Sequence, residues 1–290
     1  MRKSIFFFLL ILLIAACNQN IDKEYQSEIE KWRQDRFEYL KKPDSWFSLA
    51  GLFWLKEGEN SFGTAAENDI IFPKGKAYMG RFIYNDSTVT FVNNNEKSVL
   101  VNDSSLSTYE LKSDLTKNVT LLKYNSLTFF LIERDGKMGI RLKDSENPAL
   151  KSFTGLRYFP ISEEWKIPAN FTPYSPEKPI VIPTVLGTES IEKSPGYFTF
   201  TVDGKTLKLD VLSSGNGFFI VFADQTSGEE TYGAGRFLTV NAADSSGNYF
   251  IDFNTAYNPP CAFTKYATCP LPPKDNYLQI AVNAGEKSYH

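Results

Sequence analysis

The chain has 290 residues, of which 31 are basic, 34 are acidic and 42% are hydrophobic. A net charge of −3 excludes the broad basic surface by which proteins bind nucleic acid. The length suits one large β-rich domain or two smaller ones, each with an ample core. Aromatic residues make up 15% of the chain, and in a β-rich protein we expect most of them to fill the core.

The N-terminal sequence MRKSIFFFLLILLIAAC is typical of a secretory signal peptide. Two basic residues precede an apolar run that is shorter than the roughly 20 residues of a transmembrane helix. The residues Ile-Ala-Ala-Cys, ending at Cys17, resemble the lipobox of bacterial lipoproteins. This implies a signal peptide over residues 1–16, a lipid on Cys17 and a membrane partner in the bacterial cell envelope, with the protein facing the periplasm or the surface. The alternative is an ordinary cleaved signal.

Residues 17–45 are expected to carry the lipid and then form an amphipathic helix. Apolar side chains recur there at steps of three and four residues: Tyr25, Ile29, Trp32, Phe37 and Leu40. Pro43 is expected to end the helix. We expect it to pack on the body of the protein, because its polar face mixes acidic and basic residues where a membrane-surface helix would be basic.

Residues 46–142 form the first β-rich half. Short β-branched and aromatic runs, separated by Gly, Asn, Asp and Ser, predict a mainly β fold, a sandwich or a barrel. Asp135-Gly136 predicts a hairpin turn. The segments LKEGENSFGTAAENDIIFPKG, SVLVND and TLLKYNSLTFFLIER resemble forkhead-associated β-sandwiches, which implies that fold for this half. Thr64 stands where that family has its phosphothreonine-reading arginine, so phosphopeptide binding is not implied.

Residues 143–195 contain eight prolines and are expected to be an extended connector across the body. Residues 196–290 form a second β-rich half with four predicted strands. Asp203-Gly204, within the first predicted β run GYFTFTVDGKTLKLDVL, predicts a hairpin turn.

The catalytic options are narrowed by a single histidine, His290, at the end of the chain. This leaves no histidine for a Ser-His-Asp triad, a Cys-His dyad or a His-rich zinc centre within the body of the protein. The sequence has no phosphate-binding loop, no dinucleotide fingerprint and no CxxC pair, so it indicates neither a metal nor a particular cofactor. Acid–base chemistry would fall to carboxylates, Lys, Tyr or Cys.

Polar residues gather around the strands of the second half. Asp224 follows one apolar strand, and Arg236 opens the next. Asp252 and Asn254, two residues apart on a predicted strand, would face the same side. These groups can form a site, or they can cap turns with their side chains.

The stretch DFNTAYNPPCAFTKYATCPLPPKDN, residues 252–276, contains five prolines, which exclude it from a sheet interior. We expect an ordered loop laid over the body. In an oxidising compartment Cys261 and Cys269 would form a local disulfide. The alternatives are two buried free thiols, or a reactive or metal-binding pair that lacks a neighbouring histidine.

This stretch and its continuation NYLQIAVNAGEK, with TYGAGRFL and RDGKMGIRLKD before it, resemble the prokaryotic family known as domain of unknown function 1684. The resemblance extends from about Trp46. Members also occur without signal peptides, which weakens the expectation of a disulfide. The family's motif positions correspond to Arg134, Gly136, Arg141, Asp144, Asp224, Thr226, Tyr232, Arg236, Asp252, Asn254, Tyr257, Asn258, Pro259, Pro260, Cys261, Cys269, Pro270, Pro272, Asn276, Gly285 and Glu286. The resemblance implies no activity.

Three functions are consistent with these patterns. The first is binding of a small polar ligand or carbohydrate at a pocket walled by the Asn-Pro-Pro-Cys loop. Its candidate ligand-binding residues are Arg134, Arg141, Asp224, Arg236, Asp252, Asn254, Tyr257, Asn258, Asn276 and Glu286. The second is a structural or assembly factor of the envelope. The third is a histidine-free hydrolase in which Asp252 and Glu286, with Asp224 in reserve, divide acid and base roles within a shared cleft.

Overall fold

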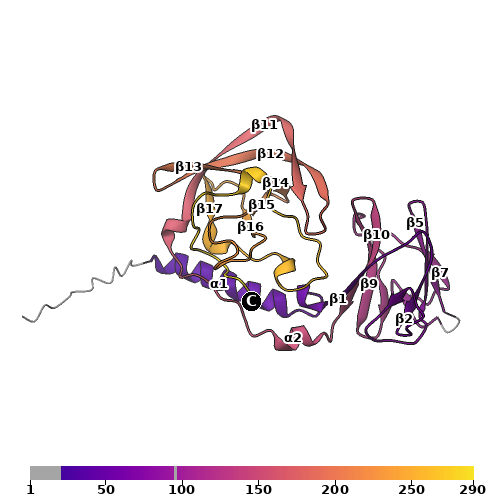
Figure 1. The fold of residues 1–290 in the computed structure, drawn as a ribbon. Coiled ribbons are helices and arrows are strands. Elements are labelled where there is room, and N and C mark those ends of the chain that lie inside the picture. The colour runs from indigo at the N-terminus through magenta and orange to yellow at the C-terminus, as the bar shows by residue number, and fades with distance from the viewer. Residues whose placement is uncertain (1–20, 95–96) are drawn as a thin grey trace, which may run out of the picture.

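The computed structural model describes residues 21–94 and 97–290 and shows a mainly β protein with one long N-terminal helix (Figure 1). This confirms the fold class, and within the described residues the sheets stay open and do not close into a barrel. The strands form two bodies. We call residues 49–144 the N-terminal unit and residues 166–290 the C-terminal unit.

The N-terminal unit is built from two five-stranded sheets. One has the order β1-β10-β9-β8-β6 and the other β3-β2-β4-β5-β7. The bounds of the first are β1 (Leu49–Trp54), β6 (Leu100–Val101), β8 (Leu122–Tyr124), β9 (Leu127–Arg134) and β10 (Lys137–Asp144). Those of the second are β2 (Gly58–Gly63), β3 (Ile70–Ile71), β4 (Gly80–Asn85), β5 (Thr88–Asn93) and β7 (Thr108–Glu110). The expected turn at Asp135-Gly136 is confirmed, because both residues have positive φ and join β9 to β10.

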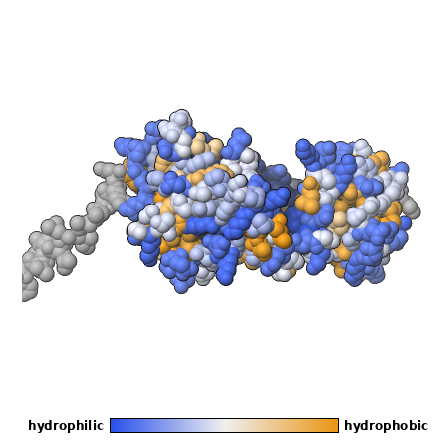
Figure 2. Space-filling model, turned by 90° about the horizontal axis from the view of Figure 1, so that it is seen from above, coloured by the Kyte–Doolittle hydropathy of each residue, from blue (hydrophilic) through white to orange (hydrophobic). Residues whose placement is uncertain are grey.

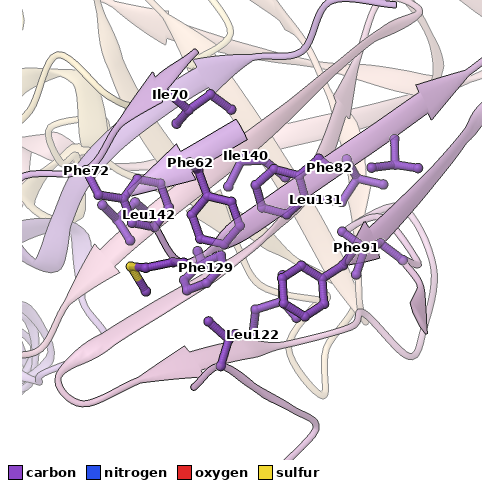
Figure 3. Packing of buried hydrophobic residues seen from close by; sticks show 14 of the residues in the cluster. Phe62, Ile70, Phe72, Phe82, Phe91, Leu122, Phe129, Leu131, Ile140 and Leu142 are labelled. Carbon is purple, nitrogen blue, oxygen red and sulfur yellow. The ribbon is translucent and has the colours of Figure 1, made fainter. Parts of the chain in front are cut away.

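Aromatic rings fill the space between these two sheets (Figure 3). Phe62 lies 4.7 Å from Phe82 and 5.6 Å from Phe129, measured between ring centroids. Alternation along β10 places Ile140 and Leu142 in this core. The same alternation directs Arg141 to the opposite face of the sheet.

The C-terminal unit has its own core and two further sheets, ordered β13-β12-β11-β17 and β14-β15-β16. Their bounds are β11 (Lys166–Pro183), β12 (Glu189–Val202), β13 (Lys205–Asp210), β14 (Leu212–Ser214), β15 (Gly217–Phe222), β16 (Arg236–Val240) and β17 (Tyr249–Asp252). The turn at Asp203-Gly204 joins β12 to β13, as expected.

The expectation of a connector over residues 143–195 is wrong for much of that segment. It begins with a short helix, α2 (Pro148–Ser152), but from residue 166 it forms the long hairpin of β11 and β12. Pro173, Pro176 and Pro179 are tolerated in β11 because β17 pairs with that edge only over residues 166–169, and no other described strand pairs with the edge beyond them. The pairing of β11 with β12 also shifts register between Pro173 and Lys178, so that Pro176 lies outside the regular ladder.

The predicted helix is α1 (Lys23–Lys41), which lies along the C-terminal unit (Figure 1). The carboxylate of Asp22 caps it by accepting a hydrogen bond from the Tyr25 N–H, and Tyr25, Ile29 and Leu40 form its buried face. The expected signal peptide over residues 1–16 and the expected lipid attachment at Cys17 lie outside the described residues. No described helix is long and apolar enough to span a membrane.

Candidate functional site

Arg236 and Asp224 form an ion pair in the interior of the C-terminal unit. Arg236 has no exposed surface, and its Nη2 lies 2.8 Å from Asp224 Oδ2. The guanidinium also donates to the carbonyls of Val282 and Ala284, while Asp224 Oδ1 accepts from the Thr226 and Val282 N–H groups. Burial lowers the pKa of Arg236, and the charge of Asp224 opposes that shift. This pair holds the C-terminal segment against β16.

Glu286 is a second fully buried carboxylate, and it connects α1 to the C-terminal unit. Its Oε1 accepts from Arg36 Nε at 2.9 Å and its Oε2 from the Asn258 N–H at 2.7 Å. Burial raises the pKa of Glu286, while Arg36 acts in the opposite direction. Asn258 donates from Nδ2 to the Lys287 carbonyl. The two hydrogen bonds of Asn258 therefore connect it to the C-terminal residues Glu286 and Lys287, and its role is structural.

Asp252 and Asn254 do not share a strand, because β17 ends at Asp252 and the next residues form a 3-10 turn, η3 (Phe253–Thr255). The expectation that both residues lie on one strand and face the same side of it is therefore wrong. Their side chains nevertheless meet, with Asn254 Nδ2 3.0 Å from Asp252 Oδ1. Tyr25 donates its hydroxyl to Asp252 Oδ2 at 2.8 Å, and burial raises the pKa of Asp252. The turn-capping alternative describes this pair.

Asn276 is also a structural residue of the interior. Its Oδ1 accepts from the Asp210 N–H, and its Nδ2 donates to the carbonyls of Asp210 and Val221. Of the three candidate catalytic carboxylates, Asp252 belongs to a network with Tyr25 and Asn254. Asp224 and Glu286 are linked through Arg236, which pairs with Asp224 and also donates to the Glu286 carbonyl at 3.5 Å. None of the three carboxylates lines the cavity described below.

The Pro/Cys loop, residues 256–273, is an ordered cover on the C-terminal unit. It contains the 3-10 turn η4 (Pro260–Ala262) and a disulfide between Cys261 and Cys269. The turn between β11 and β12 holds it from outside, since the Val185 N–H donates to the Cys269 carbonyl and the Leu271 N–H to the Pro183 carbonyl. The tip of the long hairpin therefore helps to shape this loop.

A cavity of about 580 Å³ lies where this loop, α1 and the N-terminal unit meet. In the space-filling view the two units stand on either side of a recess (Figure 2). Aromatic side chains form much of its wall: Trp32, Tyr39, Trp46, Phe219, Phe237 and Tyr257. Pro260, Ala267, Thr268, Cys269 and Pro270 of the loop complete one side, and Arg36, Arg134 and Arg141 supply the charge.

Of the ten candidate ligand-binding residues, Arg134, Arg141 and Tyr257 line this cavity. Arg134 and Arg141 come from β9 and β10, and both reach across to the Pro/Cys loop. Arg134 Nε lies 3.2 Å and Arg141 Nη2 2.9 Å from Thr268 Oγ1. The other seven residues hold the C-terminal unit together as described above.

Sequence reasoning missed most of the wall, above all Thr268, Trp46 and Phe219. The aromatic residues were expected to fill the core, and that expectation gave no reason to place any of them at a ligand-binding surface. One signal was available in α1, where Arg36 interrupts the apolar stripe. An arginine in a buried stripe needs a partner, and Arg36 has Glu286 beneath it and the Tyr257 ring 4.7 Å away.

Residues 151–287 match the family described as Protein of unknown function (DUF1684). This part of the chain belongs to that family. The matched part begins after Asp144, so the DUF1684 match covers the C-terminal unit and the Pro/Cys loop but not Arg134 or Arg141. The expected extent from Trp46 was therefore too long.

The chain is also similar to a solution NMR structure of an uncharacterised protein of Haloarcula marismortui, with 28% sequence identity and a TM-score of 0.41. The similarity covers 49% of this chain and 82% of that one. No curated protein matches the chain.

Proposed function

We propose that the protein is a lipid-anchored protein of the bacterial cell envelope that binds a small polar ligand or carbohydrate in the cavity walled by the Pro/Cys loop. The observation that carries the binding role is the cavity itself. Its volume of about 580 Å³ falls within the range of small-molecule sites. A wall of aromatic rings with a few polar groups is the usual composition of such sites.

Binding is favoured over hydrolysis because the candidate acids are committed elsewhere. Glu286 is fully buried, and its carboxylate accepts hydrogen bonds from Arg36 and the Asn258 N–H. Asp224 is paired with Arg236. A pair of catalytic carboxylates needs a shared cleft, with the carboxyl groups about 5 to 10 Å apart. The residues that line the cavity include no carboxylate.

The test is a ligand screen on the mature protein, with melting temperature as the first readout and calorimetric titration as the second. Tyr39→Ala removes one wall of the cavity at an exposed position, so folding should be little affected. Loss of an aromatic contact worth about 1 kcal/mol should weaken binding about fivefold. Tyr78→Ala, at another exposed tyrosine away from this cavity, is the matched control and should bind normally.

Two results would count against the binding role. One is a screen across sugars, organic acids, nucleotides and amino acids in which no compound shifts the melting temperature. The other is a bound compound whose affinity is unchanged in Tyr39→Ala. Either result would favour the structural or assembly role.

The anchoring is tested separately. Cys17→Ser removes the residue that would carry the lipid, so the variant should leave the membrane fraction. A variant that stays in the membrane fraction as fully as the natural protein would contradict lipidation at Cys17.

A further inference from the structure

The charge around the cavity is not balanced. Three arginines line it, and no carboxylate is among the residues that face it. Two of the three have partners behind the wall. Arg36 pairs with Glu286 at 2.9 Å, and Arg134 pairs with Asp114 at 2.7 Å.

Of the three arginines that line the cavity, Arg141 is the one that forms no ion pair with a carboxylate of the described residues. It is 7% exposed, and its one hydrogen bond there runs from Nη2 to the Thr268 hydroxyl. Its Nε is buried and has no acceptor in the part of the chain that the structure describes. Buried charges in proteins are normally paired, because an unpaired one loses its hydration without compensation.

The neighbourhood makes this charge less favourable still. Arg134 shares Thr268 Oγ1 as an acceptor, so two guanidinium groups converge on one hydroxyl. Burial, with a further contribution from Arg134, lowers the pKa of Arg141 to about 10, and the charge of Asp114, which is paired with Arg134, acts in the opposite direction. The hydroxyl of Thr268 accepts from both arginines and keeps its own hydrogen free to donate.

We propose that the ligand is a ring compound bearing a single carboxylate, which Arg141 binds through its fork of N–H groups beside Thr268. The inference rests on the proposed binding function. A planar carboxylate matches the guanidinium fork, and the aromatic wall accepts a flat apolar body. Because Arg36 and Arg134 are each neutralised by one carboxylate, one positive charge remains, which matches a monoanion better than a phosphate dianion.

The test compares three probes that share one ring system: 2-naphthoate, the uncharged 2-naphthamide and 2-naphthyl phosphate. Each is titrated calorimetrically into the mature protein. We expect 2-naphthoate to bind at least about tenfold more tightly than 2-naphthamide, because hydrogen bonds to charged groups contribute about 1.5–3 kcal/mol.

Arg141→Met keeps the unbranched apolar stem of the side chain and removes its guanidinium charge, and should abolish the preference for 2-naphthoate. Arg81→Met is the matched control. It removes a positive charge from an exposed pair with Glu59 on the same unit, outside the cavity, and should preserve the preference.

A second readout needs no ligand. If Arg141 is an unpaired binding group, Arg141→Met should melt at the same temperature as the natural protein or higher, because removing a buried unpaired charge offsets the loss of its one hydrogen bond to Thr268. If Arg141 were a structural residue, the variant would melt lower. Arg134→Met breaks the pair with Asp114 and should melt lower in either case.

The outcomes separate the two proposals. Equal binding of 2-naphthoate and 2-naphthamide would overturn the carboxylate inference and leave the binding function standing. Tighter binding of 2-naphthyl phosphate would overturn the inference of a single charge. A lower melting temperature of Arg141→Met would also count against the inference. If none of the three probes binds, the inference for this ring class is overturned, while the broader ligand screen still decides the binding function.

Discussion

Asp252 illustrates how burial changes the chemistry of a single residue. It lies at the end of β17, where the Tyr25 hydroxyl and the Asn254 amide both donate to its carboxylate. These hydrogen bonds lower its pKa, but burial acts more strongly, so the net shift is upward. Asp252 therefore binds its proton more tightly in the folded protein than in the unfolded chain.

This shift predicts a pH dependence of stability. The contribution of Asp252 is fully present below its unfolded pKa and is lost as the pH rises through the raised folded pKa. Asp252→Asn keeps an oxygen for Tyr25 but does not titrate. We expect the melting temperature of the variant, relative to the natural protein, to rise from about pH 4 to about pH 8.

Asp244→Asn provides the contrasting control. Hydrogen bonds from the Asn248 and Ser246 backbones lower the pKa of Asp244, so its contribution is present above the unfolded pKa and is lost as the pH falls. Its relative melting temperature should change in the opposite direction and mainly below about pH 4, because the folded pKa of Asp244 lies below its unfolded pKa. Parallel curves for Asp252→Asn and the natural protein would contradict the shift at Asp252.

The Pro/Cys loop is the element on which the cavity depends most. Five of its residues after Tyr257 line the wall, and the disulfide, the β11–β12 turn and the packing of Phe263 on Phe47 determine its shape. Its prolines supply no N–H groups, so hydrogen bonding in this region depends on a small set of donors. The disulfide closes the segment that carries Thr268.

We expect Cys261→Ser to lower the stability of the protein. In the chain-entropy model a disulfide closing so short a loop contributes about 2.5 kcal/mol, which corresponds to a fall in melting temperature of roughly 5–10 °C for a protein of this size. Binding in the cavity should weaken as well, because Thr268 is no longer held.

The accompanying measurement is thiol alkylation followed by mass spectrometry on mature protein in which Cys17 is replaced. Cys261 and Cys269 should be alkylated only after reduction. If both are alkylated without reductant, the loop is not closed in solution. The melting temperature of Cys261→Ser should then stay close to that of the natural protein.

At the scale of the whole molecule, two separate hydrophobic cores are joined through a narrow contact. Leu49 of β1 packs with Val221, Phe237 and Ala267 of the C-terminal unit, and Thr268 accepts hydrogen bonds from Arg134 and Arg141. A ligand in the cavity would touch both units. The contact is therefore both the wall of the site and the connection between the two bodies.

Calorimetry tests this arrangement. Two cores with few shared contacts should unfold in two transitions, and Thr268→Val should move these transitions further apart by removing the acceptor between the units. Thr264→Val is the matched control, because the Thr264 hydroxyl bonds to the Tyr266 N–H within the loop. A single transition in the natural protein, unchanged by Thr268→Val, would show that the two cores unfold as one.

The sequence alone determined the elements whose cause is local. The N-terminal helix follows from its apolar period, and the turns at Asp135-Gly136 and Asp203-Gly204 follow from residues that tolerate positive φ. The mainly β class follows from β-branched and aromatic runs. The family resemblance likewise depended on residues adjacent in the chain.

Only the tertiary structure decided which polar residues face a cavity and which hold the interior. Asp224, Asn276 and Glu286 occur in patterns as suggestive as that of Arg141, but packing surrounds them with backbone groups, and the two carboxylates also with arginines, that take up their hydrogen bonds. Arg141 lies on the outer face of its sheet, opposite a loop more than 120 residues away in the sequence, and no carboxylate of the described residues forms an ion pair with it there. Whether a polar side chain is satisfied depends on the positions of distant chain segments, and short-range sequence patterns do not contain that information.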